Sequence, residues 1–274
     1  MPELPEVETI RRQLSPALKG AKIIGVQVRF AKRISPGKAK FIKDLTGNKI
    51  LGVERRAKVL MFNLSGDLTM LVHLKMTGRL LLKNKGEKPT KHTHVVFSLS
   101  GGRELHFEDM RKFGFLKLMT NKEAKKWLED HKFGPEPLKA DFGWQHFAQC
   151  LRRKPSAKIK PWLMDPTCVV GIGNIYATEA LWRAKIHPLT PVKKLSDAQI
   201  KKLYSAIITE LKQALKDRGT SADDYLDAFG EPGAHDRKLK AYGRAGEKCS
   251  RCGTKMEKIK VAARGTTLCP KCQR

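Results

Sequence analysis

Hydrophobic positions recur along the chain with two different periods, and the change of period separates regions of different structure. In residues 4–19 the apolar side chains are three or four positions apart, with Pro5 near the beginning and Gly20 directly after the end. Proline in the first turn and glycine after the last turn are common boundaries of a helix. The pattern therefore predicts an amphipathic helix over residues 4–19.

Residues 22 to about 120 follow a different pattern, in which short runs of β-branched and aromatic residues are separated by turn residues such as Gly47-Asn48. Many short strands with frequent turns are typical of a β-sandwich. The runs predict strands at residues 23–30, 50–55, 59–64, 68–74, 95–99, 104–107 and 115–118.

The helical period returns in the second half of the chain. One segment lies around residues 180–184, and a second over residues 200–215 is preceded by Ser196 and Gln199, which have the spacing of a capping box. Residues 219–246 are rich in glycine and in charged side chains, a composition that predicts a loop. The expected fold class is α+β and multidomain, with an N-terminal helix, a β-sandwich and a helical bundle.

The charge of the chain indicates a class of binding partner. Lys and Arg number 55 against 27 for Asp and Glu, a formal net charge of +28 that is spread over the whole length. Such an excess favours a polyanion and makes binding to phosphates depend on salt. A ribosomal or merely very soluble protein is the alternative. No apolar run approaches the roughly 18 residues of a membrane helix, and the acidic amino terminus does not resemble a signal peptide, so we expect a cytoplasmic protein.

Four cysteines near the carboxyl end share a metal-binding spacing. They form C-x2-C-x16-C-x2-C, at Cys249, Cys252, Cys269 and Cys272. Two such knuckles can present four thiolates to one tetrahedral zinc ion, which then has no open position for catalysis. We expect one structural Zn²⁺; two disulfides are the alternative, which a reducing cytosol disfavours. Cys150 and Cys168 lack such a pairing and are expected to be ordinary buried thiols.

The amino terminus carries a candidate nucleophile. Removal of Met1 would leave the secondary amine of Pro2 as the α-amine, and α-amines have pKa values of about 7.7 to 8.0, so a neutral fraction exists at physiological pH. A neutral amine can attack C1′ of a deoxyribose and form an iminium ion that permits elimination. Glu3 could protonate the ring oxygen or shuttle protons. The alternative is that these residues only begin a helix, with acids at the positive end of its dipole.

Several motifs, in one order along the chain, resemble a known family. MPELPEVETIRRQL at the start is followed by RRAKVL, HLKMTGRL, FEDMRKFG, IKPWLMD, VVGIGNIYATEALW and AYGRAGEKC. Together they are similar to formamidopyrimidine-DNA glycosylase, the bacterial enzyme family that removes oxidised purines. The resemblance implies a catalytic β-sandwich over 1–120, a linker over 121–135, a helix-two-turn-helix domain over 136–240 with a lesion loop near 219–236, and a zinc finger over 241–274.

The resemblance also implies catalytic roles. Pro2 would form the Schiff base with the sugar, and Glu3 would donate a proton. Lys58 in RRAK resembles the lysine that assists β-elimination, and Arg264 resembles the zinc-finger arginine assigned to δ-elimination. For Lys58 the alternative is a strand-edge charge that opposes aggregation.

Further residues match positions that contact DNA. Met76, Arg111 and Phe113 resemble the trio inserted where a damaged base leaves the stack; Phe113 could otherwise be a core aromatic. Asn174 follows glycines at a predicted helix start, where amides can bind a phosphate, or it could be a plain N-cap. Three less secure matches to DNA-contacting positions are His92, Lys160 and Tyr242.

Two departures and two alternatives accompany this interpretation. Met110 stands where the family often has proline, and Thr93 where it often has aspartate. The expected partner is damaged double-stranded DNA at the bacterial nucleoid, bound by a monomer. An endonuclease VIII-like activity on oxidised pyrimidines is the nearest alternative, although that relative usually lacks the leucine found at Leu4. A non-catalytic zinc-finger DNA-binding protein is the alternative from another class.

Overall fold

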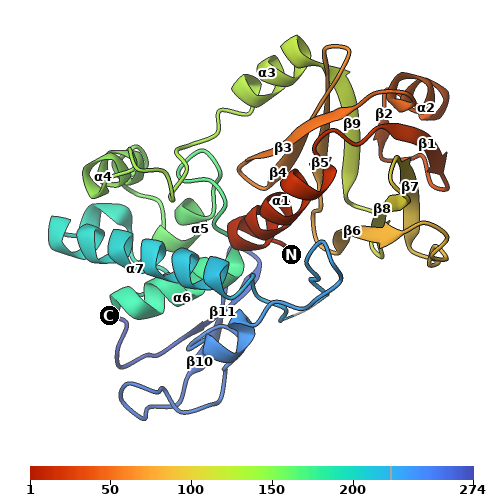
Figure 1. Cartoon of the computed structure of the whole chain (residues 1–274). Coiled ribbons are helices and arrows are strands. Elements are labelled where there is room, and N and C mark those ends of the chain that lie inside the picture. Colours follow the sequence, from red (N-terminus) through yellow and green to blue (C-terminus); the bar gives the residue numbers. More distant parts are fainter. Residues whose placement is uncertain (223) are drawn as a thin grey trace. The chain divides into compact units, whose positions relative to one another are not determined.

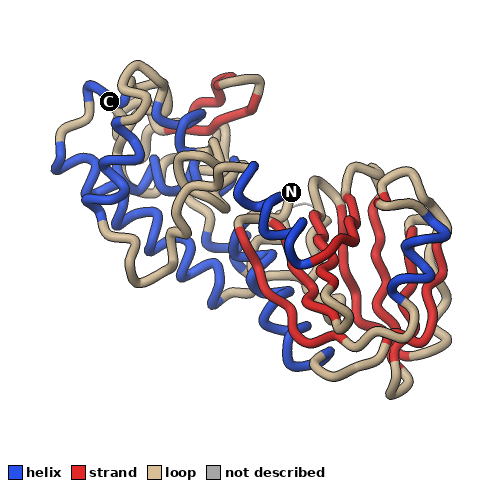
Figure 2. Tube along the Cα trace, turned by 90° about the horizontal axis from the view of Figure 1, so that it is seen from above, coloured by secondary structure: helices blue, strands red, loops and turns tan. Residues whose placement is uncertain are grey.

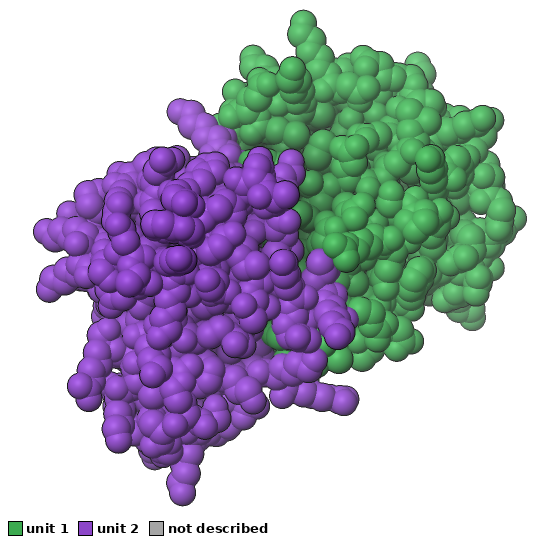
Figure 3. Space-filling model, turned by 60° about the vertical axis from the view of Figure 1, so that its left-hand side comes forward, with its two compact units in different colours: residues 1–131, 217–236 green, residues 132–216, 237–274 purple. Residues whose placement is uncertain are grey.

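The computed structural model describes residues 1–222 and 224–274. The chain forms two compact units, each made of two stretches of sequence (Figure 3). Unit 1 contains residues 1–131 and 217–236, and unit 2 contains residues 132–216 and 237–274. The lesion loop that the sequence predicts near 219–236 includes residue 223, which lies outside the described residues.

Unit 1 is a sandwich of two sheets (Figures 1 and 2). The first sheet has the strand order β1-β7-β8-β6, and the second has the order β2-β9-β5-β4-β3. A single apolar core is formed by inward side chains of both sheets and of α1, as the alternating pattern predicts. The strands are β1 (Ile23–Val28), β2 (Ile34–Ser35), β3 (Ile50–Arg56), β4 (Val59–Leu64), β5 (Leu68–His73), β6 (Gly78–Asn84), β7 (Thr93–Leu99), β8 (Arg103–Asp109) and β9 (Phe115–Thr120).

The predicted N-terminal helix is confirmed as α1 (Leu4–Leu18). Its apolar positions Val7, Ile10, Leu14 and Leu18 are almost fully buried in the core of unit 1. Burial of this stripe explains why the helix forms despite its internal Pro16.

Three longer elements of unit 1, in addition to the two-residue strand β2, are not predicted by the sequence pattern. Helix α2 (Lys38–Leu45) buries only Phe41 and Leu45. Helix α3 (Asn121–Asp130) occupies most of the stretch expected to be a linker, and it begins with a capping box between Thr120 and Glu123. Because it buries only one residue, its sequence has no apolar period from which a helix could be predicted. Strand β6 has a continuous leucine run without alternation because both of its faces are covered.

Residues 217–236, which we call the return segment, belong to unit 1 and not to the helical domain in which the sequence placed the lesion loop. Gln13 on α1 donates to Asp227 Oδ2 at 2.8 Å and accepts from the Ala228 amide at 2.9 Å. Ala228 O in turn accepts from the Leu82 amide on β6 at 2.8 Å. These polar contacts, invisible to periodicity, attach the return segment to the first unit.

Unit 2 is helical and ends in a small hairpin (Figure 1). The capping box predicted from Ser196 and Gln199 is formed at the start of the longest helix. Cys150 and Cys168 are buried, as expected. The elements are α4 (Trp144–Arg152), α5 (Ile159–Leu163), α6 (Asn174–Ala184), η1 (Val192–Lys194), α7 (Asp197–Lys216), β10 (Glu257–Val261) and β11 (Arg264–Leu268), with η2 (His235–Lys238) where the chain passes from unit 1.

Within the described part of the chain, none of the helices has both the length and the apolar character that a bilayer crossing requires.

Candidate active site and zinc centre

The first residues of the chain are held in place by a buried carboxylate. Pro2 and Glu3 are buried directly before α1, and Glu3 is the N-cap of that helix. The Glu3 amide donates to Oε2 of Glu6 at 2.8 Å, and only 1% of Glu6 is exposed. The candidate nucleophile and its acidic neighbour therefore start from a fixed backbone.

Glu6 also holds the beginning of the return segment. The Thr220 amide donates to the other oxygen, Oε1 of Glu6, at 2.8 Å. Gly219 precedes it with a φ of +91°, and a Cβ atom there would lie 2.9 Å from Cγ of Glu6. Only glycine allows this approach. One carboxylate thus joins the amino terminus to the predicted lesion loop, a role that sequence reasoning missed although Glu3-x-x-Glu6 has capping-box spacing.

Lys58 lies in a two-residue turn, because Arg56 pairs with Val59 across the hairpin of β3 and β4. The turn includes Ala57, which has a φ of +55°. Arg55 fixes it, since its guanidinium donates to Ala57 O at 2.8 Å and to Oε2 of Glu8 on α1 at 3.0 Å. The helix that begins after Pro2 is thereby tied to the hairpin that presents Lys58.

Glu8 is the anchor of this connection. Burial would raise the pKa of its carboxyl, but hydrogen bonds from Arg11, Arg55 and Arg12 more than offset burial and lower the pKa to about 2. Glu8 is therefore ionised at every physiological pH and keeps Arg55 in place.

The side chain of His73 lies in a positively charged environment that includes Lys58. Burial lowers the pKa of its imidazole, and the charges of Lys75 and Lys58 lower it further, to about 3. The neutral ring accepts a hydrogen bond from the Lys75 amide at Nδ1, at 2.9 Å. A cationic cluster of this kind suits an anionic partner.

The side chain of Asp109 connects the two loops of the predicted insertion trio. Its Oδ1 accepts from Thr77 Oγ1 at 2.5 Å and from the Arg111 amide at 3.2 Å. Its Oδ2 accepts from the Gly114 amide at 2.7 Å. Met76 lies beside Thr77 in the turn that the Gly78 amide closes on Leu74 O. One buried carboxylate therefore connects the loop of Met76 with the loop of Arg111. Sequence reasoning noted Asp109 only as part of a motif.

The same loop displays its aromatic residue to solvent. Phe113 is 45% exposed, so its alternative interpretation as a core residue is wrong. The Arg111 guanidinium lies over the ring at 5.2 Å from its centroid. An aromatic ring that is exposed to this extent beside a cation is available for stacking with a partner.

His92 lies next to this network at the start of β7. Its carbonyl accepts from the Asp109 amide at 3.0 Å, and its ring remains partly exposed. Thr93, where the family often has a carboxylate, is buried and donates to Oε1 of Glu108 at 3.0 Å. A neutral hydroxyl that is bonded within the sheet to Glu108 thus stands where the family often has a carboxylate.

In unit 2, Asn174 is the first residue of α6, and its N-cap is Gly173, so the N-cap interpretation of Asn174 is wrong. Its Oδ1 accepts from Nζ of Lys160 at 2.7 Å, and its Nδ2 donates to Gly265 O at 3.2 Å. Lys160 Nζ also donates to Thr266 Oγ1 at 2.6 Å, and the residue is only 1% exposed. Lys160 is therefore buried beside Asn174, and the DNA contact expected from its motif stays a prediction.

A pocket of about 280 Å³ opens beside Asn174 and is also lined by Tyr242 and Lys258. Tyr242 is set by Glu179 on α6, whose Oε1 accepts its amide at 2.7 Å. Burial raises the pKa of Glu179, although the three backbone amides that it binds oppose this. The first residue of an 11-residue helix, Asn174, thus lines one pocket with Tyr242 and with Lys258 of β10, an arrangement suited to phosphate.

Arg264 is the exposed first residue of β11, opposite Val261. The turn of this hairpin is Ala262-Ala263, with φ values of +46° and +61°. Two non-glycine residues in the left-handed region form a strained tip. The tip holds Arg264 next to the strand residue Gly265, whose carbonyl bonds to Asn174.

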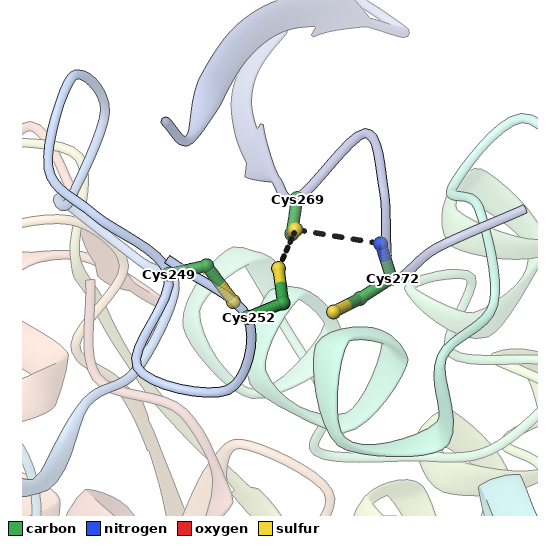
Figure 4. Close-up of side chains that lie close together, drawn as sticks. All are labelled: Cys249, Cys252, Cys269 and Cys272. Atoms are coloured by element: carbon green, nitrogen blue, oxygen red, sulfur yellow. Dashed lines mark hydrogen bonds between the residues drawn. The ribbon is translucent and has the colours of Figure 1, made fainter. Parts of the chain in front are cut away.

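The four cysteines of the finger converge, two from before β10 and two from after β11 (Figure 4). Their sulfur atoms all lie within 4.8 Å of one another, and Sγ of Cys252 and Cys269 are 3.5 Å apart. Four sulfurs around one zinc ion would be separated by about 3.8 Å, from Zn–S bonds of about 2.3 Å. All six cysteines are free thiols, so the disulfide alternative is wrong.

A buried donor outside the four thiols supports the same metal. Within the described chain, the indole nitrogen of Trp182 has no hydrogen-bond partner although it is buried, and its ring shares a buried cluster with Cys249 and Cys269. Orphaned donors beside thiols are satisfied when the sulfur carries the charge of a metal-bound thiolate. The residues fit one structural zinc.

Three family models match successive parts of the chain. They are the formamidopyrimidine-DNA glycosylase N-terminal domain at residues 1–116, the formamidopyrimidine-DNA glycosylase H2TH domain at residues 133–225, and the zinc finger found in FPG and IleRS at residues 246–274.

Whole proteins match as well. The chain is 44% identical to the formamidopyrimidine-DNA glycosylase of Lactobacillus gasseri, covering 100% of this chain and 99% of that protein. It is also 44% identical to the enzyme of Herpetosiphon aurantiacus, with both chains fully covered.

Solved structures agree with these matches. A complex of Lactococcus lactis Fpg with DNA containing an abasic site has a TM-score of 0.93 at 40% identity, covering 99% of both chains. A structure of MutM with DNA containing carbocyclic 8-oxo-G has a TM-score of 0.91 at 40% identity over the full length of both. From its amino-terminal motif to its zinc finger, this chain belongs to the formamidopyrimidine-DNA glycosylase family.

Proposed function

We propose that this chain is a bifunctional DNA glycosylase and abasic-site lyase of base excision repair, which removes 8-oxoguanine and formamidopyrimidines from duplex DNA. The observation that carries the proposal is the fixed amino terminus, where Glu6 holds both the Glu3 amide and the Thr220 amide. A nucleophile that is part of the backbone needs such an anchor, because reaction requires positioning to well within 1 Å. The family relatives and their complexes with damaged DNA support the substrate class.

The first step is attack by Pro2 after Met1 is removed. A bond forms between the proline nitrogen and C1′, and the C1′ bond to the damaged base breaks, with its electron pair leaving on the base, which takes up a proton. Glu3 protonates the ring oxygen as the sugar opens to the iminium ion. The assignment is supported by the position of Glu3, which is buried directly after Pro2 as the N-cap of α1.

Strand cleavage follows from the iminium ion, which acidifies the C2′ proton. Loss of that proton breaks the C3′–O bond, a step we assign to Lys58 as proton donor at the leaving oxygen. A second elimination removes the C4′ proton and breaks the C5′–O bond, whose electron pair leaves with the phosphate that Arg264 binds. Water then hydrolyses the iminium and restores the free amine of Pro2.

The extruded base leaves a gap that must be filled. We assign the filling to Met76, Arg111 and Phe113, whose loops Asp109 holds together. An exposed aromatic and a cation on one rigid loop can replace a lost stacking partner and donate hydrogen bonds to the orphaned base. The residues at 219–222 and 224–225, described on either side of residue 223, would cover the extruded base.

Phosphate binding is assigned to both units separately. In unit 1 it falls to His92, and in unit 2 to the pocket of Asn174 and Tyr242, with Lys160 acting indirectly by holding Asn174. Zinc, when bound, supplies structural crosslinking of the finger, and the cysteines keep the hairpin of Arg264 folded.

The alternative activity is excision of oxidised pyrimidines. A structure of Lactococcus lactis Fpg with DNA containing an oxidised pyrimidine has a TM-score of 0.93 to this chain, so a relative of this fold accommodates such a base. Leu4, Arg111 and Phe113 favour the purine enzyme. We place the protein, as a monomer, in the bacterial cytoplasm at the nucleoid.

Borohydride trapping on duplex DNA tests the proposal. We expect a covalent adduct with 8-oxoguanine opposite cytosine that maps to Pro2 and vanishes when the amino terminus is blocked. An adduct that survives blocking would exclude Pro2, and binding without any adduct would favour the non-catalytic alternative. Faster release of thymine glycol than of 8-oxoguanine would assign the chain to the pyrimidine activity.

A further inference from the structure

The end of helix α6 lies in the same buried cluster as the zinc ligands. Trp182, near the carboxyl end of α6, packs with Cys249, Cys269 and Met256 and is 7% exposed. The guanidinium of Arg251, which lies between Cys249 and Cys252 in sequence, stacks on its ring at 4.0 Å from the centroid. Arg251 also donates to Trp182 O at 3.1 Å. The first zinc knuckle is therefore built against this one side chain.

The polar atom of Trp182 is the unusual feature. Its indole N–H is buried and has no hydrogen-bond partner in the described residues, and buried donors are nearly always paired. The acceptors that the cluster offers to this donor are sulfur atoms of zinc ligands, and Cys249 belongs to the knuckle that is built against the Trp182 ring. A thiol is a weak acceptor, whereas a metal-bound thiolate is a charged one.

We propose that Trp182 is a positioning residue of the zinc centre, whose indole N–H donates to the zinc-bound thiolate of Cys249 and so slows release of the metal. Metal ligands are commonly oriented by a hydrogen bond from outside the ligand set. Here the donor comes from a helix, so the retention of zinc depends on α6 as well as on the four cysteines.

The second zinc knuckle, which contains Cys269 and Cys272, is attached near the same end of α6. Gln273 is buried, its Oε1 accepts from the Cys269 amide at 2.8 Å, and its Nε2 donates to Ile186 O at 3.0 Å, two residues beyond the helix. Trp182 and Gln273 thus attach one knuckle each. The same helix starts at Asn174, so zinc and the phosphate pocket are joined by a single rigid element.

Trp182→Phe tests the proposal, because it keeps a ring for Arg251 to cover and removes only the donor. Zinc release from the full-length protein is followed with a colorimetric chelator, and Trp144→Phe, a partly buried tryptophan of α4 outside the cluster, is the matched control. We expect release to become about tenfold faster in Trp182→Phe, the order of effect of one charged hydrogen bond. Release that is unchanged from the wild type would overturn the proposal.

Spectroscopy separates the hydrogen bond from packing. In the cobalt(II)-substituted protein, loss of a donor to sulfur makes the thiolate easier to oxidise, so we expect the sulfur-to-cobalt charge-transfer band of Trp182→Phe to move to longer wavelength. Faster release with an unmoved band would mean that only packing was lost, and the proposal would fail.

A third measurement needs no substitution and applies even where Trp182→Phe does not fold. In the cadmium-113-substituted, nitrogen-15-labelled protein, a hydrogen bond to Cys249 would transmit a scalar coupling from the metal through sulfur to the indole proton of Trp182. We expect this coupling for Trp182 alone among the four tryptophans. Its absence would overturn the proposal, and none of these readouts depends on glycosylase activity.

Discussion

Glu6 in the first helix and Thr220, 214 residues later, share a 2.8 Å hydrogen bond that joins the amino terminus to the loop predicted to cover the base. Because the two oxygens of Glu6 accept two different backbone amides, the relationship requires a carboxylate and not merely a polar side chain.

Glu6→Gln is the first prediction. An amide side chain has one acceptor oxygen, so either the Glu3 or the Thr220 amide loses its partner, at about 1–3 kcal/mol for a buried group. We expect borohydride trapping to slow by about 10- to 100-fold, while affinity for undamaged DNA is kept. Glu231→Gln, an exposed position of the return segment, is the control; equal rates in the two variants would refute the role of Glu6.

Asp109→Asn addresses the insertion loops. The amide nitrogen cannot accept from the amides and hydroxyl that Asp109 holds, so the loops of Met76 and Arg111 should lose their common support. We expect incision of a lesion within a duplex to fall at least tenfold, and cleavage of an abasic site in single-stranded DNA, where no gap must be filled, to change little. Met110→Ala on the same loop is the control. Equal losses on both substrates would place the effect elsewhere.

Because Glu8 is stabilised as a carboxylate, we expect the folded protein to lose stability in acid. Its pKa is about 2 in the folded protein against an ordinary 4.5, so its contribution is complete above pH 4.5 and disappears as the pH falls towards 2, amounting to about 3 kcal/mol at most. Urea unfolding of wild type and Glu8→Gln across this range measures it. The difference in unfolding free energy should be largest near pH 6 and shrink on acidification; a difference independent of pH would contradict this origin.

The hairpin tip gives a prediction of opposite sign. Ala263 has a φ of +61°, where glycine avoids a cost of about 1 kcal/mol. Ala263→Gly should therefore slow amide exchange in β10 and β11. Ala245→Gly, at a position without positive φ, should speed exchange or leave it unchanged. Faster exchange in Ala263→Gly would show that the tip is not strained.

Removal of zinc is expected to separate folding of the finger from folding of unit 1. A strong chelator should abolish DNA binding and trapping together, because the hairpin of Arg264 loses its crosslink. Circular dichroism of the β-sheet should change little. Undiminished DNA binding by the metal-free protein would overturn the structural role of the finger.

Much of this architecture could be predicted from local pattern. The apolar spacing before Gly20 gave α1 within one residue of its end, and the cysteine spacing was sufficient for the zinc site. The insertion trio and the amino-terminal pair came from motifs, and their roles stay predictions.

The remaining features depend on contacts between residues distant in sequence. Helix α3 buries a single residue and β6 has no alternation, so neither has a periodic signal. Glu6 binds the Thr220 amide and Asp109 binds the Thr77 hydroxyl, both on distant segments, and composition does not reveal such contacts. Lys160 has the motif of a contact residue, yet the fold places it behind Asn174.

The return segment has a consequence for synthesis on the ribosome. Tyr225 and Ala228 belong to the core of unit 1, and the amide of Leu82 on β6 donates a hydrogen bond to Ala228 O. An emerging polypeptide of 131 residues holds both sheets but lacks these partners, which follow only after the helices of unit 2 have been translated. We therefore expect the sandwich to be completed only when the return segment has been translated and the Leu82 amide of β6 gains its partner.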